Sequence, residues 1–201
     1  MPIWIRRWRR RNNVRLQRAG QVIQMGKPVL LSWSSGKDSA WALHLLRKQP
    51  EFSVTGLFTT ANQDHQRVAM HAVRLDLLRR QAEAVGLPLH ILYIPSRCSN
   101  AQYDSIMGSF VEEAKADGVR HMAFGDLFLE DVRQYREERL QAAGITALFP
   151  LWGMPTAELA RQMVMEGVRA ILTCVDPRKL PISCAGRDFD AAFLDRLPAG
   201  V

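Results

Sequence analysis

Residues 28–46 concentrate side chains that could bind and activate a phosphate group. They read PVLLSWSSGKDSAWALHLL, so an apolar run at 29–31 leads through a turn of small and polar residues into a helix-like run. The residues at 34–36 carry so little side chain that their backbone N–H groups can approach an anion closely. Asp38 and Ser39 occupy the positions expected for the N-cap and first turn of the helix. Together these features predict a strand that delivers a phosphate to a helix N-terminus.

The spacing of residues within this loop decides which of the known phosphate-binding motifs it fits. The Walker A pattern fails, because Leu31 stands where its first glycine belongs and Asp38 follows Lys37 in place of Ser or Thr. The dinucleotide pattern fails as well, because Gly36 is the loop's single glycine. Residues 34–39 do fit Ser-(Gly/Ser)-Gly-x-Asp-Ser and resemble the PP-loop of the ATP pyrophosphatases, which cleave ATP between its α and β phosphates. The alternative is an ordinary Ser/Gly turn before a helix.

Length and cysteine usage limit the classes of protein. A chain of 201 residues fits one domain and can bury a sizeable core. Its apolar runs all fall short of the roughly 20 residues that a membrane span needs, so we expect none. Cys98, Cys174 and Cys184 are odd in number and form no C-x-x-C pair, which favours a reducing, cytoplasmic location over a disulfide framework or zinc knuckle. Cys174 lies in an apolar run and is expected to be buried.

The positive charge of the chain belongs to its first 24 residues. The formal net charge is +7, but residues 1–24 hold seven arginines and no acid, which leaves 20 basic and 20 acidic residues for 25–201. The domain itself is therefore neutral, and binding to nucleic acid is not expected of it. The tail could bind nucleic acid or a membrane surface, with Trp4 and Trp8 between its arginines, or could be a targeting segment. We favour a third interpretation, in which Met25 is the true start and 1–24 is a disordered or non-native extension.

Strand-like and helix-like stretches alternate along the rest of the chain. The strand-like stretches are 29–31, 52–60, 89–94, 121–124, 146–151 and 170–175, and the helix-like ones are 40–46, 70–85, 100–116, 131–143, 156–166 and a short one within 188–196. This alternation predicts an α/β fold, a Rossmann-like doubly wound parallel sheet of about five strands with helices on both faces. Ligands of such sheets bind beyond the carboxyl ends of the strands, where the strand order reverses. Residues 34–39, Thr59 and the pair Gly125-Asp126 follow or end strands and can converge there.

Three further segments resemble one family within this class. They are GDLFLED at 125–131, YREERL at 135–140 and FPLW at 149–152, and AGRDFD at 185–190 continues the likeness. With the loop at 34–39, these segments are similar to the diphthine–ammonia ligase family of PP-loop ATPases. Its members combine such a loop with a Gly-Asp strand end, an Arg-x-Glu helix and an apolar-Trp turn. The resemblance runs from about Lys27 to about Leu197.

This resemblance implies an adenine nucleotide alpha hydrolase-like fold and a carboxylate-activating ligase. ATP is cleaved to AMP and pyrophosphate to adenylate a carboxylate, and ammonia then converts the adenylate to an amide. ATP and Mg²⁺ are the implied cofactors, while the acceptor is an unidentified carboxylate, free or carried on a protein. Residues 25–201 would form the PP-loop ATP-binding domain, with a small substrate-side portion from about residue 127. The oligomeric state is left open.

The resemblance also suggests roles for individual residues. Those implied to bind the nucleotide are Ser34, Ser35, Gly36, Lys37, Asp38, Ser39, Thr59, Gly125 and Asp126. The N–H groups of 35–39 would hold the departing pyrophosphate at the helix N-terminus. Lys37 would neutralise charge on the bridging oxygen, and Asp38 would either hold Mg²⁺ or cap its own helix.

The Arg-x-Glu helix supplies the other two catalytic candidates, Arg136 and Glu138. They lie two residues apart and cannot share a helix face, so one should reach the cleft while the other braces it. Their charged neighbours are interpreted as a solvated, salt-bridged surface: Arg133, Glu137 and Arg139. His71 is expected to face the substrate or to cap a helix, and Trp152 to wall the pocket or to lie in the core.

The chain departs from the family pattern in two places. Ser35 replaces the first glycine of the general PP-loop, a mild change where the local φ is negative. Family members also continue past the position of Val201 into a Gly-Glu-rich segment on the acceptor side. We therefore expect a truncated relative that retains the nucleotide half.

Two other functions compete with the ligase. One is a non-catalytic module that binds adenine nucleotides. The other is a tRNA-modifying PP-loop enzyme, for which the arginine-rich tail is the only support. Sulfur-transferring enzymes of that kind need paired catalytic cysteines over the nucleotide, and the sequence has no cysteine pair near the loop.

Overall fold

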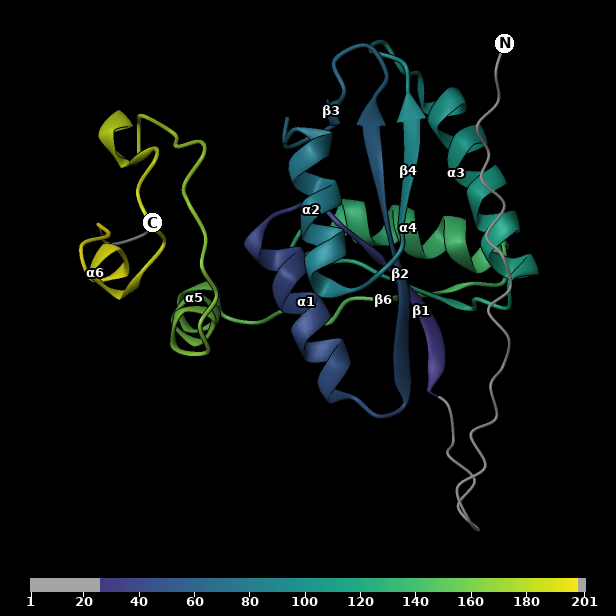
Figure 1. Cartoon of the computed structure of the whole chain (residues 1–201), viewed down its shortest axis with the longest axis horizontal. Helices are drawn as coiled ribbons and strands as arrows, with labels where there is room; N and C mark the ends of the chain where they lie inside the picture. Colours follow the sequence, from purple (N-terminus) through teal and green to yellow (C-terminus); the bar gives the residue numbers. More distant parts are fainter. Residues whose placement is uncertain (1–25, 199–201) are drawn as a thin grey trace.

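A computed structural model describes residues 26–198 of the chain (Figure 1). The arginine-rich segment 1–24, interpreted above as an extension, lies outside the described residues, as do residues 199–201. Among the helices of the described range, none is long and apolar enough to cross a membrane.

Six strands form one sheet. They are β1 (Lys27–Ser32), β2 (Phe52–Asn62), β3 (Arg67–Val68), β4 (Leu89–Ile94), β5 (His121–Ala123) and β6 (Thr146–Leu148). The five parallel strands follow the order β4-β2-β1-β5-β6, and the short β3 pairs antiparallel with the end of β2. From β1 the chain adds β2 and then β4 on one side of the sheet, and it then crosses to the other side of β1 to add β5 and β6. The order therefore reverses between β1 and β5, which confirms the predicted doubly wound sheet.

Helices cover both faces of this sheet (Figure 1). On one face lie α1 (Lys37–Lys48), α2 (Leu75–Val85) and α5 (Thr156–Met165), and on the other lie α3 (Asn100–Ala116) and α4 (Glu130–Ala142). Alternation along the strands produces the two cores, since Val29 and Leu31 pack with Trp41 of α1 while Leu30 packs with Phe110 of α3. Both cores are continuous with β1, so this strand is the centre of the domain.

The sequence signals place most helix ends correctly. Gly86, Gly118 and Gly144 have positive φ directly after α2, α3 and α4, as left-handed C-terminal glycines should. Ser99 and Gln102 form a capping box at the start of α3.

The predicted helix 70–85 begins five residues late. Residues 69–74 instead form a turn in which Ala72 is left-handed and Arg67 donates to the Ala72 carbonyl. Because α2 starts only at Leu75, its buried face consists of Leu75, Leu78 and Ala82, whereas Leu77 is exposed.

The predicted strand 170–175 is wrong. Leu172 and Ala170 exchange backbone hydrogen bonds with residues 186–189, so this run forms a local antiparallel pairing beyond α5 and does not join the sheet. Cys174 is consequently exposed, contrary to expectation, and the buried cysteine is Cys184 in the short 3₁₀ turn Ile182–Cys184. The expected short helix near the end does form, as α6 (Ala191–Leu194).

The loop between β1 and α1 contains a strained residue. Ser35 has a φ of 69°, in the left-handed region that favours glycine. Serine would replace glycine at little cost only if φ were negative here, so the replacement is not mild. A left-handed conformation costs an L-residue roughly 1–2 kcal/mol, and only tertiary structure can compensate.

Ser35→Gly is therefore expected to raise the free energy of unfolding by about 0.5–1 kcal/mol, since relief of strain exceeds glycine's extra entropy in the unfolded chain. Urea denaturation measures the change. Ser105→Gly, at an exposed position inside α3, is the matched control and should lower stability. A Ser35→Gly protein no more stable than the parent would contradict the strain argument.

Candidate functional site

The loops that follow β1 and β5 meet at the reversal of strand order. Gly125, just after β5, lies so close to α1 that a Cβ there would stand 3.1 Å from both the Asp38 carbonyl carbon and the Ser39 nitrogen. These are backbone atoms, which would have to shift by a few tenths of an ångström to admit a side chain, so glycine is strongly favoured here. The predicted Gly-Asp strand end therefore packs directly against the first turn of α1.

The first turn of α1 presents unused backbone donors. Gly36 is the N-cap residue and supplies no side-chain cap. The N–H groups of Lys37, Asp38 and Ser39 make no hydrogen bond to any other described residue. The Ser39 hydroxyl instead donates to the Gly36 carbonyl at 2.9 Å and accepts from Ser34 at 3.2 Å, which fixes the loop. Three free donors at a positive helix end form a site suited to a polyphosphate.

The two charged residues of the loop pair with each other. Lys37 Nζ lies 2.7 Å from Asp38 Oδ1, and both side chains are about one-third exposed. Lys37 Nζ also lies 5.8 Å from the ring centroid of Phe189. The segment 185–190 thus reaches the loop, although it is remote in sequence.

A cavity of about 920 Å³ opens in front of this loop. Several of the predicted site residues line it: Ser34, Asp38, Ser39, Thr59, His71, Gly125, Asp126 and Arg136. Thr59 is buried within β2, which continues to Asn62. His71 lies in the turn before α2. Ser35, Gly36 and Lys37 belong to the loop beside the cavity and do not line it.

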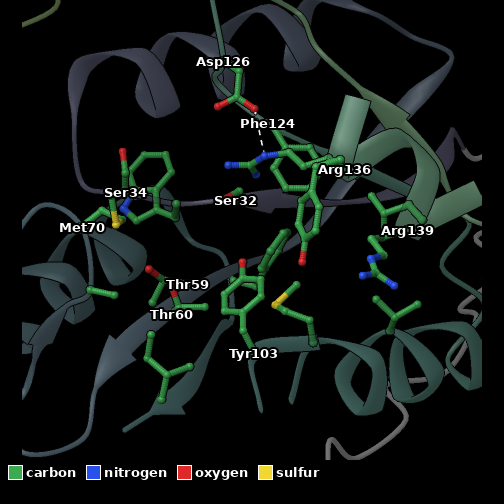
Figure 2. Close-up of a pocket in the computed structure, with 18 of the residues that line it drawn as sticks. Ser32, Ser34, Thr59, Thr60, Met70, Tyr103, Phe124, Asp126, Arg136 and Arg139 are labelled. Carbon is green, nitrogen blue, oxygen red and sulfur yellow. Dashed lines mark ion pairs between the residues drawn. The ribbon is translucent and has the colours of Figure 1, made fainter. Parts of the chain in front are cut away.

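An ion pair lies at one edge of the site (Figure 2). Arg136 Nε of α4 lies 3.1 Å from Asp126 Oδ2, and its guanidinium stacks 4.1 Å above the ring of Phe124. The contact between Arg136 Nε and Asp126 Oδ2 does not have hydrogen-bond geometry, so the buried Oδ2 atom forms an ion pair but accepts no hydrogen bond. Burial raises the pKa of Asp126, and the charge of Arg136 offsets this only in part.

Two predicted site residues lie elsewhere. Glu138 is exposed and accepts a 2.7 Å hydrogen bond from Gln134 on the outer face of α4. Arg136 thus faces the cavity while Glu138 faces away, as their spacing required. Trp152 does not wall this cavity. It lines a smaller one of about 300 Å³, where the Arg133 guanidinium lies 4.7 Å from its ring centroid.

Sequence reasoning missed the cavity residues between α3 and α4. Asp104 of α3 accepts a hydrogen bond from the Tyr135 hydroxyl and pairs with Arg139 at 2.8 Å. Arg139 is solvated and salt-bridged, as expected, but it also lines the cavity. The pKa of Tyr135 is raised to about 12, mainly by burial and secondly by its hydrogen bond to Asp104. Tyr103 also lines the cavity. The helical spacing of 103/104, 107/108 and 111 on α3 was the available signal, and the neighbouring charges obscured it.

Comparison with known protein families identifies the family of this chain. Its doubly wound sheet, with a helix N-terminus at the switch point, is an arrangement that many nucleotide-binding α/β domains share. The family model for the diphthamide synthase N-terminal domain matches residues 26–146, and the chain belongs to this family. Membership places it among ATP-binding proteins of the ATP-pyrophosphatase superfamily.

One similar solved structure is the U34-tRNA thiolase NcsA from Methanococcus maripaludis with its [4Fe-4S] cluster. The two chains are 16% identical with a TM-score of 0.42, and the match covers 87% of this chain and 66% of the thiolase. No curated protein sequence matches the chain.

Asp126→Asn should leave the protein at least as stable as the parent at neutral pH. Because the folded pKa of Asp126 is raised, the folded state binds the extra proton, and the parent loses stability as pH rises from the ordinary value of ~3.9 through the folded pKa. At pH values below this range Asp126 is protonated in both the folded and the unfolded state, so the parent and the variant should have similar free energies of unfolding. Denaturation curves from pH 3 to 8 measure the difference.

Asp131→Asn is the control, since this exposed carboxylate in the first turn of α4 favours its helix and its loss should stabilise nothing. An Asp126→Asn protein clearly less stable than the parent at neutral pH would mean that the contact with Arg136 outweighs the cost of burial.

Proposed function

We propose that the protein cleaves Mg-ATP to AMP and pyrophosphate in order to adenylate a carboxylate, which ammonia then converts to an amide. Family membership supports the nucleotide half of this proposal. The observation that carries it is the set of free N–H groups on Lys37, Asp38 and Ser39, held at the strand-order reversal by the close approach of Gly125.

The first step makes one bond and breaks one. A carboxylate oxygen of the acceptor attacks the α-phosphorus, the bond to the α–β bridging oxygen breaks, and pyrophosphate leaves with that electron pair. The free N–H groups of α1 bind the growing negative charge, and Lys37 can turn from Asp38 toward the bridging oxygen. In the second step ammonia attacks the acyl carbon, AMP leaves, and the nitrogen loses a proton.

The charged residues fit a magnesium ion that accompanies ATP. Asp38 and Asp126 both present carboxylates to the cavity, and the Oδ2 atom of Asp126 is the one already paired with Arg136 at 3.1 Å. Hard oxygen ligands of this kind suit Mg²⁺, which takes its remaining ligands from phosphate oxygens and water. When bound, it neutralises phosphate charge. Asp126 and Asp38 are the residues that would hold it.

Arg136 is proposed to position the acceptor carboxylate and the α-phosphate. Its guanidinium is fixed by Asp126 on one side and by Phe124 beneath it, so little side-chain entropy remains to be lost. Residues from about 127 onward are proposed as the substrate-side portion. Two features support this: α4 lines the cavity, and Phe189 lies against Lys37.

Product analysis after incubation with Mg-ATP, ammonium and a panel of carboxylates as acceptors tests the proposal. AMP and pyrophosphate are expected, and Lys37→Ala and Asp38→Ala should each lower their formation by about 10²-fold or more, as loss of an electrostatic group at a reacting phosphate does.

Lys48→Ala and Asp76→Ala are matched controls on exposed helix positions away from the loop and should leave the rate unchanged. Formation of ADP and phosphate would refute cleavage between the α and β phosphates. ATP binding without any turnover would favour a non-catalytic nucleotide-binding module.

A further inference from the structure

The cavity continues beyond the nucleotide loop into a space between α3 and α4, which we name the interhelical chamber. One stripe from each helix lines it: Tyr103, Asp104, Met107, Gly108, Val111 and Glu112 from α3, and Tyr135, Arg136, Arg139, Leu140 and Ala142 from α4. Figure 2 places Ser34, Thr59 and Thr60 at one end of the cavity and Arg139 at the other. The total volume of about 920 Å³ lies near the top of the roughly 300–1,000 Å³ range of small-molecule sites.

A glycine keeps the wall of the chamber open. Gly108 lies in the middle of α3, where glycine costs a helix about 1 kcal/mol relative to alanine. A Cβ at this position would meet no atom within 4 Å, so packing does not explain the glycine. Gly108 is exposed, so its missing side chain widens the rim where the cavity opens to solvent, beside Met107 and Val111.

The chamber floor is apolar and its inner end is polar. Phe58, Val111, Phe124 and Leu140 are buried and line it. At the inner end, Tyr103 points its hydroxyl toward the cavity beside Arg136 (Figure 2). Burial raises the pKa of Tyr103, so its hydroxyl remains a donor at neutral pH.

The charges favour an anionic group at this inner end. Asp104 pairs with Arg139 and Glu112 pairs with Lys115, so both chamber carboxylates already have cations. Arg136 meets Asp126 through Nε, and its Nη groups form no hydrogen bond with any of residues 26–198. Two Nη donors and one tyrosine hydroxyl can bind a carboxylate.

We propose that the interhelical chamber is the acceptor subsite and takes an aliphatic chain that ends in the carboxylate to be adenylated. The chain lies over the apolar floor and passes Gly108, and Tyr103 and Arg136 hold its carboxylate toward the nucleotide. This assignment rests on the proposed function, since it identifies the carboxylate bound here as the one that attacks ATP.

Calorimetric titration of the full chain with hexanoate and with acetate, in the presence of Mg²⁺ and a non-hydrolysable ATP analogue, tests the assignment. Each buried methylene strengthens binding about fourfold, so hexanoate should bind at least about tenfold more tightly than acetate. Gly108→Leu fills the chamber and should weaken hexanoate binding about tenfold or more while the ATP analogue binds as before. Tyr103→Phe should weaken both carboxylates about fivefold or more, through loss of a hydrogen bond to a charged group.

Two variants separate these effects from general damage. Gly108→Ala should raise the melting temperature, because alanine favours the helix and finds open space. Tyr93→Phe, at a partly exposed tyrosine of β4 outside the cavity, should change neither affinity.

The possible failures are distinguishable. The assignment of the chamber would be overturned if the Gly108→Leu protein bound hexanoate as tightly as the parent does. It would also be overturned if Gly108→Leu weakened binding of the ATP analogue. Binding of the ATP analogue without either carboxylate would also overturn it, and the proposed cleavage of ATP would stand. Failure of the ATP analogue to bind the parent protein would overturn the proposed function and the assignment together.

Discussion

The close approach of Gly125 to the first turn of α1 is the contact on which the site depends. It joins the end of β5 to the start of α1 across the one place where the strand order reverses. A side chain at residue 125 would push them apart by a few tenths of an ångström, because backbone atoms of Asp38 and Ser39 lie 3.1 Å from its Cβ position. The contact brings Asp126 beside the free N–H groups of α1, and Arg136 follows through its pair with Asp126. One small residue thus aligns three elements on a single crevice.

This alignment carries structural costs that suit a binding site better than a core. Ser35 is held in a left-handed conformation, and the buried Asp126 keeps an acceptor without a hydrogen bond. Gly108 interrupts the middle of α3, where alanine would favour the helix. Strain, a buried charge and a glycine inside a helix would each be unfavourable in a domain selected for stability alone. All three border or line the cavity of about 920 Å³ and are separate in sequence.

Local patterns in the sequence predicted the sheet and the meeting of the loop at 34–39 with Gly125 and Asp126. Alternating apolar residues, glycine stops and the Ser-Ser-Gly-Lys-Asp-Ser loop all act over a few residues, so β1, β4, α1 and α3 were placed nearly as observed. The run 170–175 failed because its strand character is satisfied by residues 186–189 and not by the sheet. Trp152, Arg139 and Ser35 depend on tertiary placement or backbone conformation, which residue type alone does not determine. The extra space at Gly108 is likewise visible only when α3 and α4 are seen facing each other.

The central claim is that the first turn of α1 binds the polyphosphate of ATP, and amide chemical shifts in isotopically labelled protein test it most directly. Titration with Mg-ATP should shift the amide resonances of residues 36–39 more than any others, because their N–H groups gain charged acceptors. Titration with AMP, which lacks the β and γ phosphates, should move them little. Equal shifts with AMP and Mg-ATP, or ATP-dependent shifts that leave residues 36–39 unmoved, would contradict the account.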